Sequence, residues 1–404
     1  MSVRAPAARP LPVLVVAAAL ACGTAVSLGL ARFAYALLLP SMRADLGWSY
    51  FVAGAMNTVN ALGYLAGALA APMAMARLGA RTTLVVASAA TALALAAHGV
   101  VAGDAALYAL RFASGLVSAP SLVAGAVLAA ELGGAAGGTR AAPAGLVLGM
   151  YYGGTGLGIV VAALLVPALL ATGQFHAWQP AWIGLGVVGA LATVLVALGT
   201  RGRGARAAAH AAAGERERFR WTPFAPALLA YLLFGLGYIG YMTFVITLLR
   251  ERQLAPGVVT AFYAMLGVAV VASSWVWAGM LQRFRAGESL AILNALLAVA
   301  TLLPLLSATP FAVFASGLLF GGVFLSLVTS TTALIRHNLA PAHWPSAISA
   351  FTVLFAAGQI VGPALVGLVA DRFGGLGAGF ACSAAVLGLG ALAATRQRAL
   401  PISR

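Results

Sequence analysis

Two arginines lie inside long apolar segments of this chain. Arg32 occurs in the stretch from Leu11 to Leu39, and Arg111 opens a second phrase, Arg-Phe-Ala-Ser-Gly, in a similar setting. An ionised side chain at membrane depth costs about 2.5–3.5 kcal/mol on insertion scales, so it needs a partner or a water-filled cavity. No carboxylate occurs near the middle of an apolar segment. The chemistry that these residues favour is binding of an anion through charge-assisted hydrogen bonds to guanidinium.

The two arginines are expected at a similar depth. Arg32 lies about seven residues before Leu39, the expected outer end of the first segment, and Arg111 about six residues into the fourth. At 1.5 Å per residue, both lie roughly 9–10 Å below the outer surface and can face one cavity. The alternative is structural, with each guanidinium neutralising helix-end carbonyls or a backbone kink at a glycine.

Further polar residues recur at helical spacing. Arg111 is followed by serines at i+3, i+7 and i+10, and Asn57 by Asn60 and Tyr64 at i+3 and i+7. Such groups need internal partners in lipid, and an aqueous cavity supplies them. Helix–helix hydrogen bonds are the alternative for the asparagines, and simple packing for the aromatic stripe Tyr231, Phe234, Tyr238 and Tyr241. The candidate substrate-binding residues are Arg32, Tyr35, Asn57, Asn60, Arg111, Tyr152, Tyr238, Tyr241 and Gln359.

Enzyme and metal signatures are absent from the sequence. There is no H-E-x-x-H or G-x-S-x-G, and a P-loop requires a lysine, which the chain lacks. His337 and His343 share one connection but have no third ligand nearby. Without a mid-span carboxylate, His98 is the one titratable candidate for carrying a proton near the membrane. We therefore expect no catalytic residue, no metal and no cofactor.

The composition is that of a membrane protein. Of 404 residues, 62% are hydrophobic and 8% are charged, whereas a soluble domain carries about 25% charged residues. All 23 basic residues are arginines, and the net charge is +15. Because the arginines lie between apolar runs rather than along one stripe, they indicate membrane topology and not nucleic-acid binding. The expected partners are the lipid bilayer and a small molecule; nothing requires an oligomer, and a monomer is the working expectation.

Apolar runs near or above the roughly 20 residues needed to cross a bilayer recur along the chain. The most polar connection, from Arg201 to Arg220, divides them into six and six, so residues 1–200 and 223–404 are predicted bundles joined by a basic linker over 201–222. The sequence predicts an all-α protein with twelve spans, at about 12–38, 50–72, 82–102, 105–130, 144–171, 180–200, 224–248, 258–281, 288–307, 310–334, 347–370 and 376–395.

The arginines also predict orientation. Only Arg43, Arg250, Arg252 and Arg372 fall in the connections on one side, while all other loop arginines fall on the side of the termini and the linker. The positive-inside rule then places both termini in the cytoplasm, in a bacterial inner membrane. A cleaved secretory signal is the alternative for the first segment, but its apolar run continues past Cys22 and is long enough to span.

Six plus six spans with a basic central linker resembles the major facilitator superfamily. Between spans two and three, Arg77, Gly79 and Arg81 resemble the superfamily's loop signature G-x-x-x-D-R-x-G-R-R, although Ala76 replaces its aspartate. Arg111 with Gly115 resembles the fourth-span motif R-x-x-x-G. The resemblance implies a secondary transporter with a central site and alternating access, in which the loop signature takes part in the conformational change.

Other phrases are similar to those of one bacterial branch, the YbfB/YjiJ-like transporters. They are Arg-Phe-Ala-Tyr from Arg32, Gly-Leu-Gly-Tyr from Gly235, Gly-Gly-Val-Phe from Gly321 and Gly-Gln-Ile-Val-Gly-Pro from Gly358. The resemblance covers nearly the whole chain and implies nothing about the substrate. Together with the two arginines, it predicts transport of a small organic anion. The alternatives are export of an amphipathic or aromatic compound, with Trp275, Trp277 and the tyrosines as its surface, and, from other classes, a membrane-embedded enzyme or a sensor.

Overall fold

The computed structural model describes residues 11–134, 144–172, 175–202 and 220–400. All regular structure in these ranges is helical, and twelve segments are long and apolar enough to cross a membrane. The predicted fold class and number of spans are therefore confirmed. The linker expected over 201–222 lies largely outside the described residues.

The first span consists of α1 (Val13–Thr24), a π-helix (Ala25–Phe33) and α2 (Tyr35–Leu46). The helices that follow in the same half of the chain are α3 (Tyr50–Leu78), α4 (Ala80–His98), α5 (Asp104–Gly134), α6 (Ala144–Leu170) and α7 (Trp178–Gly199). In the second half they are α8 (Ala225–Glu251), α9 (Pro256–Val276), the short α10 (Ala278–Arg283), α11 (Glu288–Leu306), α12 (Pro310–Asn338), α13 (Trp344–Arg372) and α14 (Leu376–Thr395).

The first span is longer than the sequence predicted. It continues through Pro40 to Leu46, where Gly47 ends it in a left-handed conformation at φ 66°. Arg32 is therefore fourteen residues from the end of the span, which is about 20 Å along the helix at 1.5 Å per residue. This end was predicted at Leu39, seven residues earlier, so Arg32 lies about twice as far from the end of the helix as predicted.

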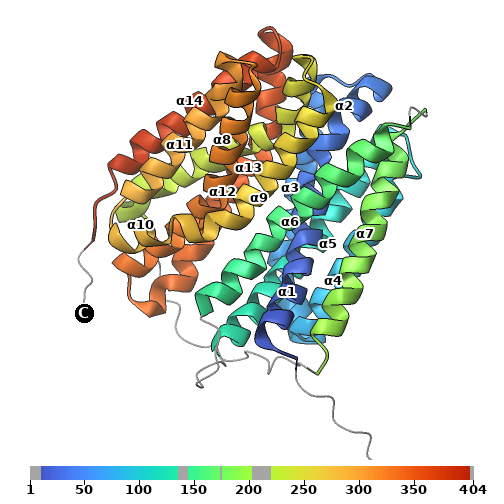
Figure 1. Cartoon of the computed structure of the whole chain (residues 1–404). Coiled ribbons are helices and arrows are strands. Elements are labelled where there is room, and N and C mark those ends of the chain that lie inside the picture. Colours follow the sequence, from blue (N-terminus) through green and yellow to red (C-terminus); the bar gives the residue numbers. More distant parts are fainter. Residues whose placement is uncertain (1–10, 135–143, 173–174, 203–219, 401–404) are drawn as a thin grey trace, which may run out of the picture.

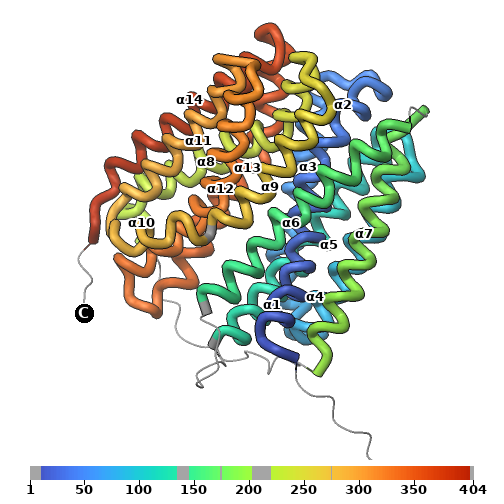
Figure 2. The backbone as a smooth tube through the Cα atoms, viewed as in Figure 1, coloured from blue at the N-terminus to red at the C-terminus, as the bar shows by residue number. Residues whose placement is uncertain are grey.

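The helices form two bundles, α1–α7 and α8–α14, which lie side by side in Figure 1. The bundles meet mainly where α3 packs on α13 and α6 on α9, with α2 against α8. Figure 2 shows that α1 begins and α14 ends at the same end of the molecule. We call this end, near which α7 ends and α8 begins, the linker face, and the other end the opposite face.

Backbones of the two bundles touch closely in the half toward the opposite face. A Cβ atom at Gly54 would lie 2.2 Å from the Pro363 carbonyl oxygen, and one at Gly367 would lie 2.3 Å from that of Tyr50. Nearer the middle, a Cβ at Gly156 would lie 2.3 Å from the Gly267 oxygen. Glycine at these positions is required for the bundles to approach this closely.

Hydrogen bonds between the bundles are also concentrated toward the opposite face. The carboxylate of Asp371 accepts from the backbone N–H groups of Tyr50, at 3.0 Å, and Phe51, at 2.8 Å, in the first turn of α3. The Tyr50 hydroxyl donates to Glu251 at 2.6 Å, and Arg43 lies 3.6 Å from the same carboxylate. Among the described residues, no comparable bond joins the linker-face halves, and the ribbons diverge there in Figure 1. The structure is thus closed at the opposite face.

Candidate functional site

Arg32 is positioned by the π-helix in the first span. The Gly29 carbonyl accepts from the Ala34 N–H at 3.0 Å, a spacing of five residues that defines the wider π turn. At this level the span lies against α6, where a Cβ at Gly29 would be 2.5 Å from the Gly158 Cα. Arg32 occurs in the last turn of this π-helix, a type of irregularity that is frequent at functional sites.

The Arg32 guanidinium lies between the two bundles. Its Nη2 donates to Oε1 of Gln359 on α13, and its Cζ lies 5.3 Å from the ring centre of Tyr64. The side chain is 5% exposed, and its Nε–H has no hydrogen-bond partner. Among the described residues, no carboxylate lies within ion-pair distance of it. Arg32 is therefore a buried cation with an unused donor and a neutral partner.

Aromatic residues near this cation keep some exposed surface. Tyr64 and Tyr152 are partly exposed, and so is Phe355, which precedes Gln359 by one turn of α13. Tyr64 contacts Arg32, and Arg32 bonds across to the other bundle. Four predicted site residues, Arg32, Tyr152, Tyr238 and Gln359, are near one another in this region.

Arg111 has a different environment, inside the first bundle. Its Nη1 donates to the Ala31 carbonyl at 3.0 Å, and its Nη2 donates to Oδ1 of Asn57 at 2.8 Å. The guanidinium also lies 4.6 Å from the ring centre of Tyr35, and the residue is 1% exposed. Its two terminal nitrogens thus join the π-helix and α3.

The two predicted asparagines join helices to one another. Asn57 continues the contacts of Arg111 across the bundles, because its Nδ2 donates to the Thr243 hydroxyl at 2.7 Å. Asn60 donates to the Arg111 carbonyl at 3.0 Å and to Ser114 at 3.1 Å. These are the helix–helix bonds that the sequence left open as the alternative to lining a cavity.

Two predicted tyrosines are engaged elsewhere. The buried Tyr35 donates to the Ala53 carbonyl at 2.9 Å. Tyr241 hydrogen-bonds to Ser316 at 2.7 Å and stacks on Phe320 at 3.9 Å, inside the second bundle. The structure does not bring Tyr241 to Arg32.

The loop signature and His98 also make contacts within the first bundle. Arg81 donates to the carbonyls of Thr200, at 2.8 Å, and Ala197, at 3.0 Å, and so caps the end of α7. Arg77 is exposed, and Gly79 has a φ of 79°, which favours glycine. His98 is fully buried, with Nδ1 2.7 Å from the Ala94 carbonyl and its ring stacked on Trp182 at 4.4 Å.

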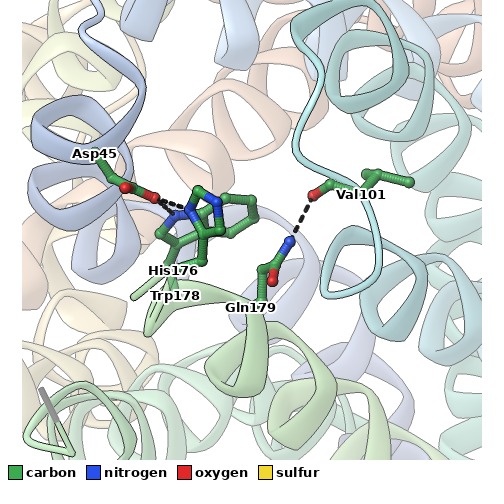
Figure 3. A network of polar contacts seen from close by, with 5 residues as sticks. All are labelled: Asp45, Val101, His176, Trp178 and Gln179. Carbon is green, nitrogen blue, oxygen red and sulfur yellow. Dashed lines mark hydrogen bonds and ion pairs between the residues drawn. The ribbon is translucent and has the colours of Figure 1, made fainter. Parts of the chain in front are cut away.

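A polar network that the sequence did not indicate lies at the opposite face of the first bundle. Figure 3 shows Asp45 at the end of α2 bonded to His176 and to the Trp178 indole nitrogen, while Gln179 donates to the Val101 carbonyl at 3.1 Å. All these residues belong to one bundle, so the network fixes the connections around α7 rather than the contact between bundles.

Sequence reasoning also missed Phe355 and Thr243 and left Tyr64 out of its candidate set. The signal for two of them was available, since Phe355 lies four residues before Gln359 and Tyr64 lies seven residues after Asn57. Each therefore shares a helix face with a predicted site residue. Nothing comparable distinguishes Thr243, because its role depends on contact between helices from different halves of the chain.

Comparison with known proteins supplies a family and a set of similar folds. The model of the family described as "Uncharacterised MFS-type transporter YbfB" matches residues 24–395. The nucleoside transporter NupG is similar in structure, with a TM-score of 0.70 and 14% identity over 95% of this chain and 100% of that one. No curated protein sequence matches the chain.

Two further solved structures resemble this chain in fold. One is a bacterial homologue of the human lysosomal transporter Spinster, inward-facing and unoccupied, with a TM-score of 0.72 and 15% identity over 94% of this chain and 96% of that one. The other is the human organic anion transporter MFSD10, with a TM-score of 0.60 and 15% identity over 95% and 100%. At these identities the likeness shows the fold alone.

Proposed function

The chain belongs to the YbfB-like family of major facilitator superfamily transporters, and we propose that the cargo of this secondary transporter is a small organic anion that binds Arg32. The observation that carries the proposal is the guanidinium itself, buried between the bundles with an unused donor and, among the residues that the structure describes, no carboxylate partner. An anion at this position would complete both its charge and its hydrogen bonds.

Gln359 occupies the place that the anion would take. Its amide oxygen is a neutral acceptor for Arg32, and hydrogen bonds to ionised acceptors are roughly twice as strong as neutral ones. A carboxylate would therefore displace the amide and leave it free to bond another part of the cargo. Arg111 supports the site indirectly, because its hydrogen bond to the Ala31 carbonyl fixes the helical turn that carries Arg32.

The orientation that we propose follows from the arginine asymmetry. It places the linker face in the cytoplasm and the protein in the inner membrane, so the structure, closed at the opposite face, would be the inward-facing state. Transport would then proceed by rocking of the two bundles about the central site.

Export of an amphipathic compound remains the second candidate. Of the two tryptophans predicted for it, Trp275 is 48% exposed, and Trp277 donates to the Gly322 carbonyl at 2.7 Å. Neither contacts Arg32. What favours an apolar cargo is instead the stacking of Phe234, Tyr238 and Phe355 in the second bundle, and an anionic group on the same molecule is compatible with it.

The two arginines provide the test. Arg32→Lys keeps the charge but loses the planar fork, so we expect binding of small organic anions to weaken by about tenfold or more, the equivalent of a charged hydrogen bond, with an unchanged melting temperature. Arg111→Lys breaks two bonds inside the first bundle, and we expect a lower melting temperature instead.

Melting temperature and ligand affinity are measured on one purified preparation of each variant, with a panel of carboxylates and their neutral amides as ligands. Arg32→Lys protein that melts early and binds anions like the wild type would overturn the proposal.

A further inference from the structure

The second bundle presents a stack of nearly parallel aromatic rings beside Arg32. Its members, here called the ring stack, are Tyr231, Phe234 and Tyr238 of α8, Phe324 of α12 and Phe355 of α13. Building on the proposed function, we infer that the organic anion carries an aromatic ring, which packs against this stack while its anionic group binds Arg32.

The geometry of the ring stack is regular. Phe355 lies 4.8 Å from Tyr231 and 5.2 Å from Phe234, with interplanar angles of 18° and 13°. Tyr238 continues the stack, 4.7 Å from Phe234 at 27° and 5.9 Å from Phe324 at 11°. These centroid distances fall in the range at which offset-stacked rings attract one another. A planar ring added to the stack would meet the same favourable geometry.

The ring stack reaches the cation. Phe324 packs edge-on against Phe33, the neighbour of Arg32, with centroids 5.8 Å apart. Arg32 is also close enough to Tyr238 to interact with it electrostatically. Phe355 is one helical turn from Gln359, the present partner of Arg32. An aromatic acid that replaced the Gln359 oxygen at Arg32 would therefore have its ring next to the stack.

A second aromatic cluster in the same bundle shows what simple packing looks like. Tyr241, Phe320 and Phe380 are all fully buried, and the Tyr241 hydroxyl is satisfied by Ser316. Tyr241 and Phe320 stack at 12°, but Phe380 is tilted by 49° relative to Tyr241, and Phe320 by 31° relative to Phe324 of the ring stack, so the parallel arrangement does not continue through this cluster. The ring stack differs because its member Phe355 remains partly exposed, with surface available to a ligand.

The two bundles thus contribute different chemistry to one site. The first supplies the guanidinium, and the second supplies rings and the neutral amide of Gln359. Alternating access requires the cargo to contact both bundles as they rock about it. A small anion without an apolar body would contact mainly Arg32, whereas an aromatic acid fills both halves of the site.

The test compares three probes of similar size by isothermal titration of the purified full chain. Benzoate has charge and ring, cyclohexanecarboxylate has charge without an aromatic ring, and benzamide has the ring without charge. One aromatic pair contributes about two- to tenfold in affinity beyond buried area, so we expect benzoate to bind tighter than cyclohexanecarboxylate by that factor.

Two variants localise the effect. Phe355→Leu should abolish the preference for benzoate, while Phe355→Tyr, which keeps the ring, should retain it. The matched control is Phe380→Leu, which removes a buried ring outside the stack and should leave the preference unchanged.

The outcomes separate this inference from the proposed function. Equal binding of both carboxylates, weakened in Arg32→Lys, would overturn the aromatic inference and leave the anion proposal standing. Benzamide binding as tightly as benzoate would overturn the anion proposal itself. Failure of benzoate to bind at millimolar concentration, or a preference that survives in Phe355→Leu, would also overturn the aromatic inference.

Discussion

Asp371 is expected to hold the opposite face closed. Its carboxylate caps the first turn of α3 from the other bundle, accepting from Tyr50 and Phe51 at 3.0 and 2.8 Å. An anion at a helix N-terminus contributes typically 0.3–1 kcal/mol at an exposed site, and loss of a cap costs about 1 kcal/mol. Since Asp371 is exposed, we take its contribution to the stability of the closed opposite face as about 1 kcal/mol. Asp371→Ala should then raise the population open at this face about fivefold.

The assay requires a reporter that reacts only when this face opens. Thr247 is 3% exposed and lies one turn from Thr243, which bonds across the bundles. Thr247→Cys, in a chain whose two native cysteines are replaced by serine, places a thiol there with little change in shape. In intact cells its labelling by a membrane-impermeant maleimide is proportional to the open fraction, so a fivefold change is measurable even when that fraction is small.

A matched acid on the same face provides the control. Asp104 accepts from the Trp48 indole at 2.9 Å, within the first bundle, so Asp104→Ala should leave the labelling rate unchanged. Combining Asp371→Ala with Glu251→Ala, which removes the contact with the Tyr50 hydroxyl, should raise the rate further. An unchanged rate in Asp371→Ala, or an equal rise in Asp104→Ala, would refute the reasoning.

Three other predictions follow from the same structure. Gly54→Ala should raise labelling at position 247, because the added Cβ would lie 2.2 Å from the Pro363 oxygen of the other bundle. Gly63→Ala would place a Cβ 2.1 Å from the Phe112 oxygen inside one bundle, so it should lower the melting temperature instead. Uptake of a non-titrating anion should persist as exchange when the proton gradient is collapsed, since no mid-span carboxylate is present; loss of exchange would contradict this. Reporter fusions after residue 210 and at the C-terminus should both report cytoplasm. Periplasmic signals from both would reverse the orientation that we propose, and a periplasmic signal from the C-terminus alone would mean a miscounted span in the second half.

The fold was predictable because its determinants are local along the chain. Each span is an apolar run bounded by polar residues, glycine or proline, and the lengths required by a bilayer limit the alternatives. The error occurred where this signal weakens, at the end of the first span. There Ser41, Arg43 and Asp45 lower the hydropathy although the helix continues to Leu46. The helix continues through these polar residues because they find partners in the protein, as Asp45 does in His176 and Trp178.

The site was predictable only in part, because its geometry depends on contacts between distant helices. The sequence distinguishes Arg32 and Arg111 from every other arginine but not from each other. Helical spacing placed Asn57 and Arg111 on cavity-facing surfaces, yet the two bond to each other at 2.8 Å. The π turn that positions Arg32 has no recognisable sequence signal, and the partnership of Arg32 with Gln359 joins residues 327 positions apart.

The contacts of the two arginines suggest how cargo and conformation are linked. The bonds from Ala31 through Arg111 and Asn57 to Thr243 cross the bundles without needing a cargo, so they stabilise the closed opposite face in the empty carrier. The bond from Arg32 to Gln359 also crosses the bundles, but there a bound anion would replace it. A bound anion would therefore exchange one inter-bundle contact for another that passes through the cargo. A ligand that contacted only Arg32 would weaken the interface, whereas one that also contacted the ring stack would restore it. A ligand shifts a conformational equilibrium only through such differential contacts, so cargo that spans both surfaces is the kind that this arrangement can carry through the rocking motion.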